Sequence, residues 1–428
     1  MPTQTTNQST TLDLARRVNE LKPSITVALN NKAKAMKADG IDVLGFAAGE
    51  PDFDTPQVIK DAAIKALNDG QTKYTPTLGD MPTRQCIADK LTRENNIPGL
   101  TGEHVAIGVG GKHVLYNAMQ CLSAPPQLGE DPWEMILPTP AWVSYRPVCE
   151  LAGGVVREVV AGPDTDFRIS PAQLQDAINP RSRVLILNSP SNPCGTMYSE
   201  QDLRDLAKVI KEGFERAPQL VVLTDEIYEK IVYGQHPHFS IGSIPEIAER
   251  VITINGMSKA YAMTGWRIGY AAMPGDFGKN LIKAMGKLQG QMTTNITSFN
   301  YPAIREALTN PQVEAEVEKM RQAFAKRADL IMSRLNDIPG VQCPTPTGAF
   351  YVFPDVSALF GKTSAKGTKV TSATTLCEAM LEEAHIAFVP GEDFGGISGN
   401  HLRISFACSE DQINAGMDRF KAFVESMS

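Results

Sequence analysis

The chain has 428 residues, 42% of them hydrophobic and 21% charged, which is ordinary for a soluble globular protein of about two domains. Lys and Arg number 41 and Asp and Glu 48, so the net charge of −7 argues against a general binder of nucleic acids or acidic membranes. The seven cysteines are scattered without a C-x-x-C pair, so neither a disulfide framework nor a zinc site is indicated; we expect no bound metal and a reducing cytoplasm.

The N-terminal segment begins with a polar stretch, residues 1–11, which is expected to be disordered and has no apolar core of a secretory signal. Helical periodicity follows, and a short apolar strand ends at Gly49. Residues 55–70 are typical of a helix with a proline near its start and a glycine near its end. Tyr74 comes directly after this helix, where the residue pattern alone indicates only packing.

From residue 104 onward, short apolar runs alternate with amphipathic segments, which is the pattern of a parallel sheet covered by helices. Residues 105–109 form a predicted strand that runs into Gly110, Gly111 and Lys112 at the start of a helix, where backbone N–H groups can bind an anion. A second strand is followed by Trp142. Taken alone, this tryptophan is equally consistent with a buried core residue.

Two further predicted strands end in polar residues. Residues 184–187 lead into a Pro-rich loop that contains Asn192, and loops at the carboxyl ends of strands commonly carry function. The run of residues 220–223 is followed by Asp225 and Tyr228. An acid at the end of a buried strand is costly unless a cation pairs with it. His238, a few residues later, is expected to be an ordinary loop residue.

The most informative stretch is residues 252–270. A buried strand, residues 252–254, is followed by Ser258 and Lys259 and then by Arg267 in a Gly-rich loop. Burial favours the neutral amine of a lysine and so makes it a nucleophile. The serine hydroxyl and the arginine guanidinium are suited to phosphate oxygens. An amine beside an anion site is what pyridoxal 5'-phosphate (PLP) requires.

The C-terminal part begins with an amphipathic helix, residues 316–337, which we expect to connect two domains. A second, smaller region with strands follows, and residues 361–372 are expected to form a flexible surface loop. Along residues 402–406, apolar side chains alternate with Arg403 and Ser405. This alternation alone is typical of an edge strand whose arginine faces water.

The run of residues 256–269 contains Gly256, Ser258, Lys259, Ala262, Gly265, Arg267 and Gly269. It resembles the PLP-lysine signature of class I aminotransferases, and the likeness extends over about residues 15–425. Within that family the chain looks most similar to the aspartate and prephenate aminotransferases of bacterial and plant type. The resemblance implies an α/β fold of PLP fold type I. A large domain, residues 53–315, would hold a mostly parallel sheet, and residues 12–52 and 316–428 would form a small domain with an N-terminal arm.

The resemblance also implies roles for residues around PLP. Lys259 would bind the cofactor and move the substrate's Cα proton, Asp225 would keep the pyridine nitrogen protonated, and Tyr228 would contact the ring oxygen. The further cofactor-binding residues it implies are Gly110, Gly111, Lys112, Trp142, Asn192, Ser258, Arg267 and, donated across a homodimer interface, Tyr74. Asn192 stands in S-N-P-C-G where the family usually has N-N-P-T-G, so its neighbours differ.

For the substrate, the resemblance implies that Arg403 holds the α-carboxylate and Lys112 the distal carboxylate of an acidic amino acid. Gly49, Trp142 and Asn192 would also line the substrate site, and Thr26 would accompany use of prephenate. We therefore expect PLP-dependent transamination between aspartate or glutamate and a 2-oxo acid. Two alternatives use the same cofactor site: a carbon–sulfur lyase, and an aminotransferase for aromatic or neutral amino acids. A regulator with an aminotransferase-like domain would need a DNA-binding segment, for which this acidic chain has no room.

Overall fold

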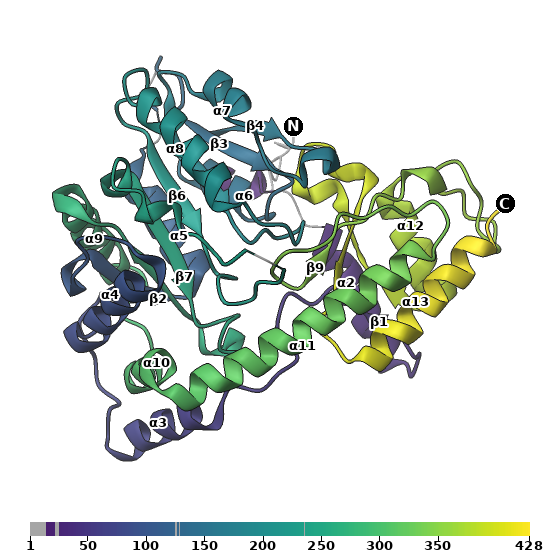
Figure 1. Ribbon diagram of the computed structural model, residues 1–428, viewed down its shortest axis with the longest axis horizontal. Coiled ribbons are helices and arrows are strands. Elements are labelled where there is room, and N and C mark those ends of the chain that lie inside the picture. The colour runs from purple at the N-terminus through teal and green to yellow at the C-terminus, as the bar shows by residue number, and fades with distance from the viewer. Residues whose placement is uncertain (1–13, 22–24, 125, 128, 235) are drawn as a thin grey trace, which may run out of the picture.

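The computed structural model describes residues 14–21, 25–124, 126–127, 129–234 and 236–428. The predicted tail, residues 1–11, lies outside this part, and so does the side chain of Thr26. Figure 1 shows two lobes side by side, a larger one built around the long sheet and a smaller one that contains the C-terminus. This arrangement confirms the α/β class expected from the sequence.

A seven-stranded sheet forms the centre of the larger lobe. Its strands, in spatial order, are β2 (Val105–Val109), β8 (Ile268–Ala272), β7 (Val251–Gly256), β6 (Val221–Asp225), β5 (Ser182–Asn188), β3 (Glu134–Thr139) and β4 (Val155–Val160). Strands β4, β3, β5, β6 and β7 pair in parallel. Only β8 runs antiparallel to its neighbours β7 and β2. The sheet is therefore mostly parallel, and the carboxyl ends of its parallel strands share one edge.

Both faces of this sheet are covered because its strands are apolar on both sides. In β5, Val184 and Ile186 belong to the core that contains helices α5, α6 and α9, whereas Leu185 and Leu187 belong to the core that contains α7 and α8. Helices α3, α4 and α10 cover the β2 and β8 end on a third core. The continuous apolar runs seen in the sequence are thus explained by burial of alternate residues on opposite faces.

The helices of the described chain are α1 (Arg16–Asn19), α2 (Ile25–Ala38), α3 (Gln57–Asn68), α4 (Met81–Asn95), α5 (Gly111–Leu122), α6 (Tyr145–Leu151), α7 (Pro171–Ala177), α8 (Glu200–Gly213), α9 (Gly275–Gly290), α10 (Asn300–Thr309), α11 (Pro311–Asn336), α12 (Ala373–Ala379) and α13 (Glu410–Glu425). Several begin at a side-chain cap: Asp80 accepts a hydrogen bond from the Thr83 N–H at α4, and Ser199 caps α8. In the part of the chain that the structure describes, we find no helix both long and apolar enough to cross a membrane.

The smaller lobe contains two short sheets. One has the order β11 (Val389–Pro390), β12 (Leu402–Ser405) and β9 (Tyr351–Val352), and the other pairs β1 (Leu44–Gly45) with β10 (Ile386–Ala387). Helices α2, α11, α12 and α13 close the core around them. Helix α11 runs from the larger lobe into the smaller one (Figure 1). It crosses residue 316, the predicted domain boundary, which therefore falls inside a helix.

One expectation for this lobe needs correction. Strand β12 lies between β11 and β9 rather than at an edge, and Arg403 is only 6% exposed, so the arginine does not face water. Its partners come from distant parts of the chain, which the local alternation could not show. Residues 361–372 lie at the surface, as expected; an isolated β-bridge joins Thr363 to Lys369, and the buried Ser364 hydroxyl donates to Glu383.

Candidate active site

Close backbone packing brings two loops of the predicted site together. Gly269 of β8 pairs with Gly256 of β7 on one side and with Gly108 of β2 on the other. A Cβ atom on Gly269 would lie 2.3 Å from the carbonyl carbon of Gly110 and from the nitrogen of Gly111. Only glycine permits this approach. The start of α5 therefore lies directly against the strand that follows the Ser258 to Arg267 loop.

Arg267 and Ser258 lie at the same end of the sheet. A Cβ on Gly110, whose φ is +86°, would lie 2.4 Å from Arg267 Nη2, so the guanidinium covers the turn before α5. Arg267 Nη1 donates to the Thr264 carbonyl at 3.0 Å, and Ser258 is buried two residues past β7. A guanidinium, a hydroxyl and the first N–H groups of a helix form a suitable anion site.

Lys259 reaches from this anion site across the edge of the sheet, and its ammonium donates a hydrogen bond to the Gly49 carbonyl. Burial lowers the pKa of Lys259 to about 8, an effect that the nearby Glu50 carboxylate opposes and the Arg267 and Arg403 guanidinium groups reinforce. Glu50 itself accepts from the Thr264 hydroxyl at 2.7 Å. Near neutral pH an appreciable fraction of this amine is thus neutral and nucleophilic.

Asp225 is a buried carboxylate at the end of β6. Its Oδ2 accepts from the Tyr145 hydroxyl at 2.8 Å and its Oδ1 from the Ile227 N–H at 3.2 Å. Burial raises the pKa of Asp225, and these hydrogen bonds only partly offset that effect. Among the described residues it forms no ion pair. A buried acid of this kind is suited to a cation supplied from outside the chain, such as a protonated ring nitrogen.

Tyr228 belongs to a pair of hydroxyl groups beside the lysine. Its hydroxyl lies 2.9 Å from that of Tyr351, and both rings are buried. A Cβ on Gly49 would lie 3.1 Å from the Tyr351 hydroxyl, so Gly49 completes this corner of the site. Tyr228, Gly49 and Lys259 are therefore brought together from three separate segments of the sequence.

Arg403 and Asn192 form the other side of the site. Arg403 Nη1 donates to Asn192 Oδ1 at 3.2 Å, and Nη2 donates to the Ala47 carbonyl at 3.0 Å. The guanidinium lies over the rings of Tyr351 and Phe394, at 4.9 and 5.4 Å from their centroids. Its Nε is buried without a hydrogen-bond partner. A fixed guanidinium with a spare donor is a suitable receptor for a carboxylate.

Lys112 and Trp142 line the open side of the site. The Lys112 ammonium lies 5.0 Å from the centroid of the Trp142 ring, which packs edge-on against Tyr145 at 5.3 Å. Lys112 and Arg267 also line a cavity of about 450 Å³, together with His113, Tyr116 and Ser144. Two cations of the site thus border this cavity, whose other lining residues come mainly from α5 and α6.

The structure brings most of the predicted residues together, with one exception. Tyr74 is 90% exposed on the loop after α3, outside the described site of its own chain. Three residues of the site were missed: Tyr145, Tyr351 and Glu50. Glu50 could have been found from the G-E-P sequence beside the predicted Gly49, whereas nothing in the sequence distinguishes the two tyrosines from core residues.

These residues fit PLP on observations of this chain alone. The amine of Lys259 is shifted toward its neutral form, Asp225 is a buried acid that lacks a cation, and the α5 start with Ser258 and Arg267 offers an anion cradle. An aldehyde, a ring nitrogen and a phosphate match these three groups.

Comparison with known proteins extends this picture. The family model of aminotransferase class I and II matches residues 41–420. The chain is 43% identical to the aspartate/prephenate aminotransferase of Cereibacter sphaeroides, covering 97% of this chain and 99% of that protein. It is 42% identical to the aspartate aminotransferase of Geobacillus stearothermophilus, covering 97% and 100%.

Solved structures agree with the sequence comparison. The aspartate aminotransferase from Rhizobium meliloti superposes with a TM-score of 0.89 at 36% identity, covering 98% of this chain and 100% of that one. The aspartate aminotransferase from Thermus thermophilus with maleate gives a TM-score of 0.87 at 39% identity, covering 96% and 100%.

Proposed function

Because the chain belongs to the class I and II aminotransferases, we propose that it uses PLP to transfer the amino group of aspartate or glutamate to a 2-oxo acid. The observation that carries the proposal is the position of Lys259, with its lowered pKa, between a buried acid and two separate cationic groups. The reacting amine, the electron sink and the carboxylate receptors are then supplied from one edge of the sheet.

PLP, when bound, supplies an aldehyde that takes up an amino group and a pyridine ring that accepts electrons from the substrate Cα. Lys259 would hold the cofactor through this aldehyde and would move the substrate's Cα proton as base and then acid. Its pKa of about 8 suits both roles near neutral pH. Asp225 stabilises a protonated ring nitrogen, and Tyr145 holds that carboxylate in place.

The remaining residues orient the two ligands. Gly110, Gly111, Ser258 and Arg267 hold the phosphate, Trp142 stacks on the ring, and Tyr228 and Asn192 contact its phenolic oxygen. Arg403 holds the substrate α-carboxylate in a bidentate pair, assisted by Asn192 and by the backbone at Gly49. The packing of Arg403 on Tyr351 and Phe394 supports this role, because it fixes the plane of the guanidinium.

An acidic substrate needs a second cation, and Lys112 is our candidate for it. Its ammonium lies over the Trp142 ring, and it borders the same cavity as Arg267. The names of the relatives support a dicarboxylate, and so does the maleate in the Thermus structure, since maleate carries two carboxylates. The name of the Cereibacter relative makes prephenate a further candidate acceptor.

We also propose a cytoplasmic homodimer in which Tyr74 of each subunit reaches the phosphate of the other. The 90% exposure of this tyrosine supports the idea, because a large aromatic ring at the surface is free to enter a neighbouring subunit. The seven cysteines are free thiols, in keeping with a reducing compartment.

A matrix of amino donors against oxo-acid acceptors on the purified enzyme tests the function. We expect the highest kcat/KM with aspartate or glutamate and with oxaloacetate or 2-oxoglutarate, and prephenate belongs in the acceptor set. Controls without any acceptor measure pyruvate and ammonia from β-substituted amino acids. Release of these products at rates above transamination would replace the proposal with a lyase.

We expect Arg403→Lys to lower kcat/KM for every amino acid by a similar factor, mainly through KM. Each substrate carries the α-carboxylate, and a point charge cannot reproduce the two parallel hydrogen bonds of a guanidinium. Such bonds to charged groups are worth about 1.5–3 kcal/mol, or roughly ten- to a hundredfold. Steady-state kinetics with aspartate and alanine check this, and an effect confined to aspartate would contradict it.

Lys112→Ala should lower kcat/KM for aspartate and glutamate by roughly ten- to a hundredfold and leave alanine or an aromatic donor little changed. The reason is that only acidic substrates carry the distal carboxylate. Lys279→Ala is a matched control, since it removes a lysine whose partner is Glu103 on the surface. Equal losses for acidic and neutral donors would assign Lys112 to the cofactor instead.

A further inference from the structure

The turn that follows β6 has two faces with different chemistry. Asp225 and Tyr228 face the proposed cofactor site, whereas Glu226 and Glu229, one residue further along in each case, are buried on the other side. The turn is closed by the Glu229 N–H, which donates to the Glu226 carbonyl at 2.9 Å. Two buried carboxylates that the proposed reaction does not use thus lie directly behind two residues that it does use.

Helix α4 supplies the partners of both carboxylates. Asn95 Nδ2 donates to Glu229 Oε2 at 2.6 Å and to Glu226 Oε2 at 3.1 Å. The Lys90 ammonium, 1% exposed, donates to Asn95 Oδ1 at 2.8 Å and forms an ion pair with Glu229. The other carboxylate oxygen of Glu226 accepts from Ser240 at 2.7 Å. The turn is therefore tied to α4 by a buried charge pair.

His238 joins this group to a second loop of the site. The Ser189 backbone, at the start of the loop that carries Asn192, raises the pKa of the His238 imidazole, so the two groups lie close together. Its Nε2 lies 3.8 Å from Glu226 Oε2 and is buried without a hydrogen-bond partner, and the side chain is 10% exposed. The turn after β6 and the loop after β5, two of the segments that present cofactor-binding residues, thus lie against the same buried cluster.

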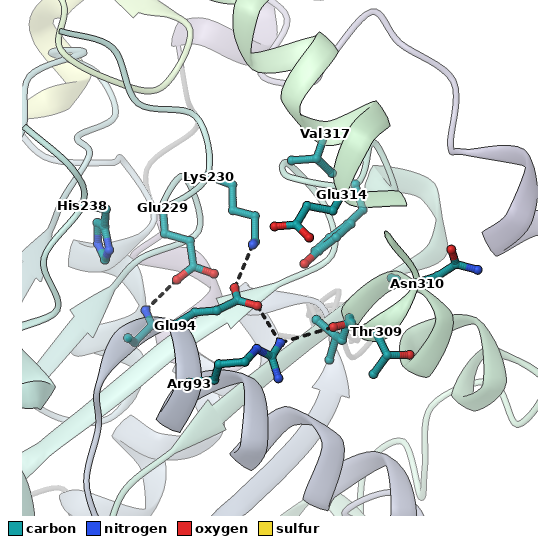
Figure 2. A pocket seen from close by; sticks show the side chains of 13 residues that line it. Arg93, Glu94, Glu229, Lys230, His238, Thr309, Asn310, Glu314 and Val317 are labelled. Carbon is teal, nitrogen blue, oxygen red and sulfur yellow. Dashed lines mark hydrogen bonds and ion pairs between the residues drawn. The ribbon is translucent and has the colours of Figure 1, made fainter. Parts of the chain in front are cut away.

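Glu229, Asn95 and His238 line a cavity of about 550 Å³, through which the cluster reaches solvent. Figure 2 shows Glu229 and His238 at one end of it, with Arg93 and Lys230 both reaching Glu94. The ligand atoms of Glu226, Glu229 and His238 lie within 4.8 Å of one another, a spacing suited to a metal ion. However, Lys90 and the Asn95 amide already occupy the carboxylate oxygens that face the group, so the lysine serves as its cation.

The charges of the two acids differ. Burial acts against ionisation of Glu229, but the Lys90 charge outweighs it and lowers the pKa to about 2. Burial and the Glu229 charge raise the pKa of Glu226 to about 8, and burial lowers the pKa of His238 to about 4. At neutral pH the cluster then holds one ion pair, one protonated acid and one neutral imidazole.

Building on the proposed function, we propose that Lys90, Asn95, Glu226, Glu229 and His238 form a positioning network that holds Asp225, Tyr228 and Asn192 against the cofactor. None of its members touches the reacting atoms. Loss of one partner of the buried ion pair leaves a charge that the interior cannot solvate. The turn must then shift to expose it, and a displacement of about 1 Å at a catalytic group can cost as much as a hundredfold in rate.

We expect Glu229→Gln to lower kcat by about ten- to a hundredfold with a smaller change in KM, and to weaken PLP binding. The absorbance of bound PLP, followed as a function of pH, should shift as well, because it depends on the positions of Asp225, Tyr228 and Asn192 around the cofactor. Glu226→Gln should have a smaller effect on each quantity, since glutamine resembles the protonated acid. Lys90→Met combined with Glu229→Gln removes both charges and should recover part of the loss.

Leu206→Ala on α8 is the control for stability, because it removes a buried apolar side chain that belongs to the core of α7 and α8 and makes no hydrogen bond to the cluster. It should lower the melting temperature without altering the PLP spectrum. If Glu229→Gln behaves like this control, or if the two glutamine variants are equally impaired, the proposal is wrong. Should Glu229→Gln not fold, Asn95→Ser tests the same expectation. Failure of the proposed function would appear in the wild-type enzyme, whereas failure of the network appears only between variants.

Discussion

Replacing Lys259 by alanine is expected to abolish turnover and covalent attachment of PLP. The variant loses both the amine that bonds the aldehyde and the base that takes the Cα proton, and general base catalysis alone contributes roughly 10²–10⁴-fold. Lys259 is the predicted lysine because its pKa is lowered to about 8 by burial between Gly49 and the anion site. We expect no transamination above the rate of PLP in solution.

Borohydride reduction followed by peptide mapping identifies the attached residue. A modified lysine resists trypsin, so the labelled wild-type peptide should run from Val251 to Arg267. Label on a peptide without Lys259 would contradict the assignment. Lys112→Ala serves as a matched control that should remain labelled. Cofactor-free Lys259→Ala protein should still melt cooperatively, which separates loss of chemistry from loss of fold.

Asp225→Ala should bind PLP more weakly and lose most of its ability to remove the Cα proton. A buried acid that pairs with the ring nitrogen keeps the ring an effective electron acceptor, and breaking such a pair costs about 3–5 kcal/mol. If the whole of that energy is lost from the transition state, the rate falls by roughly two to four orders of magnitude. Exchange of the Cα proton of aspartate into heavy water, followed by NMR, measures this step directly.

Two further variants separate the effect of the Asp225 charge from that of its hydrogen bond to Tyr145. Asp225→Asn keeps the shape but not the charge and should resemble the alanine variant. Tyr145→Phe keeps the charge and removes only the hydroxyl at 2.8 Å, so its loss should be smaller. Near-normal proton exchange in Asp225→Ala would show that the carboxylate is not needed for the electron sink.

The residues that could be predicted from the sequence share a local signature. Lys259, Asp225 and Asn192 each follow a buried strand, and the carboxyl ends of parallel strands meet at one edge of a sheet, so each strand with its loop could be recognised in isolation. The fold class followed from the same alternation of apolar runs. The division into domains remains a prediction, although α11 crosses its proposed boundary.

The surroundings that the local pattern could not predict depend on contacts between distant segments. Arg403 is buried because β9 and β11 flank its strand, and the alternating pattern of residues 402–406 contains no information about those neighbours. Tyr145 and Tyr351 acquire their roles from Asp225 and Tyr228. Glu229 would be expected at the surface because its counter-ion, Lys90, lies 139 residues earlier in the chain.

Helix α11 contributes to two hydrophobic cores without interruption. Val313 and Val317 pack with α3, α4 and α10, whereas Phe324, Ile331 and Leu335 belong to the core of the smaller lobe. Its only proline stands at the first position, and it contains no glycine at which the helix could break. Unfolding of either core would therefore disrupt a helix that the other core requires. We expect the two lobes to unfold as one cooperative unit. A packing defect far from Lys259 can thus reduce the folded fraction of the whole enzyme.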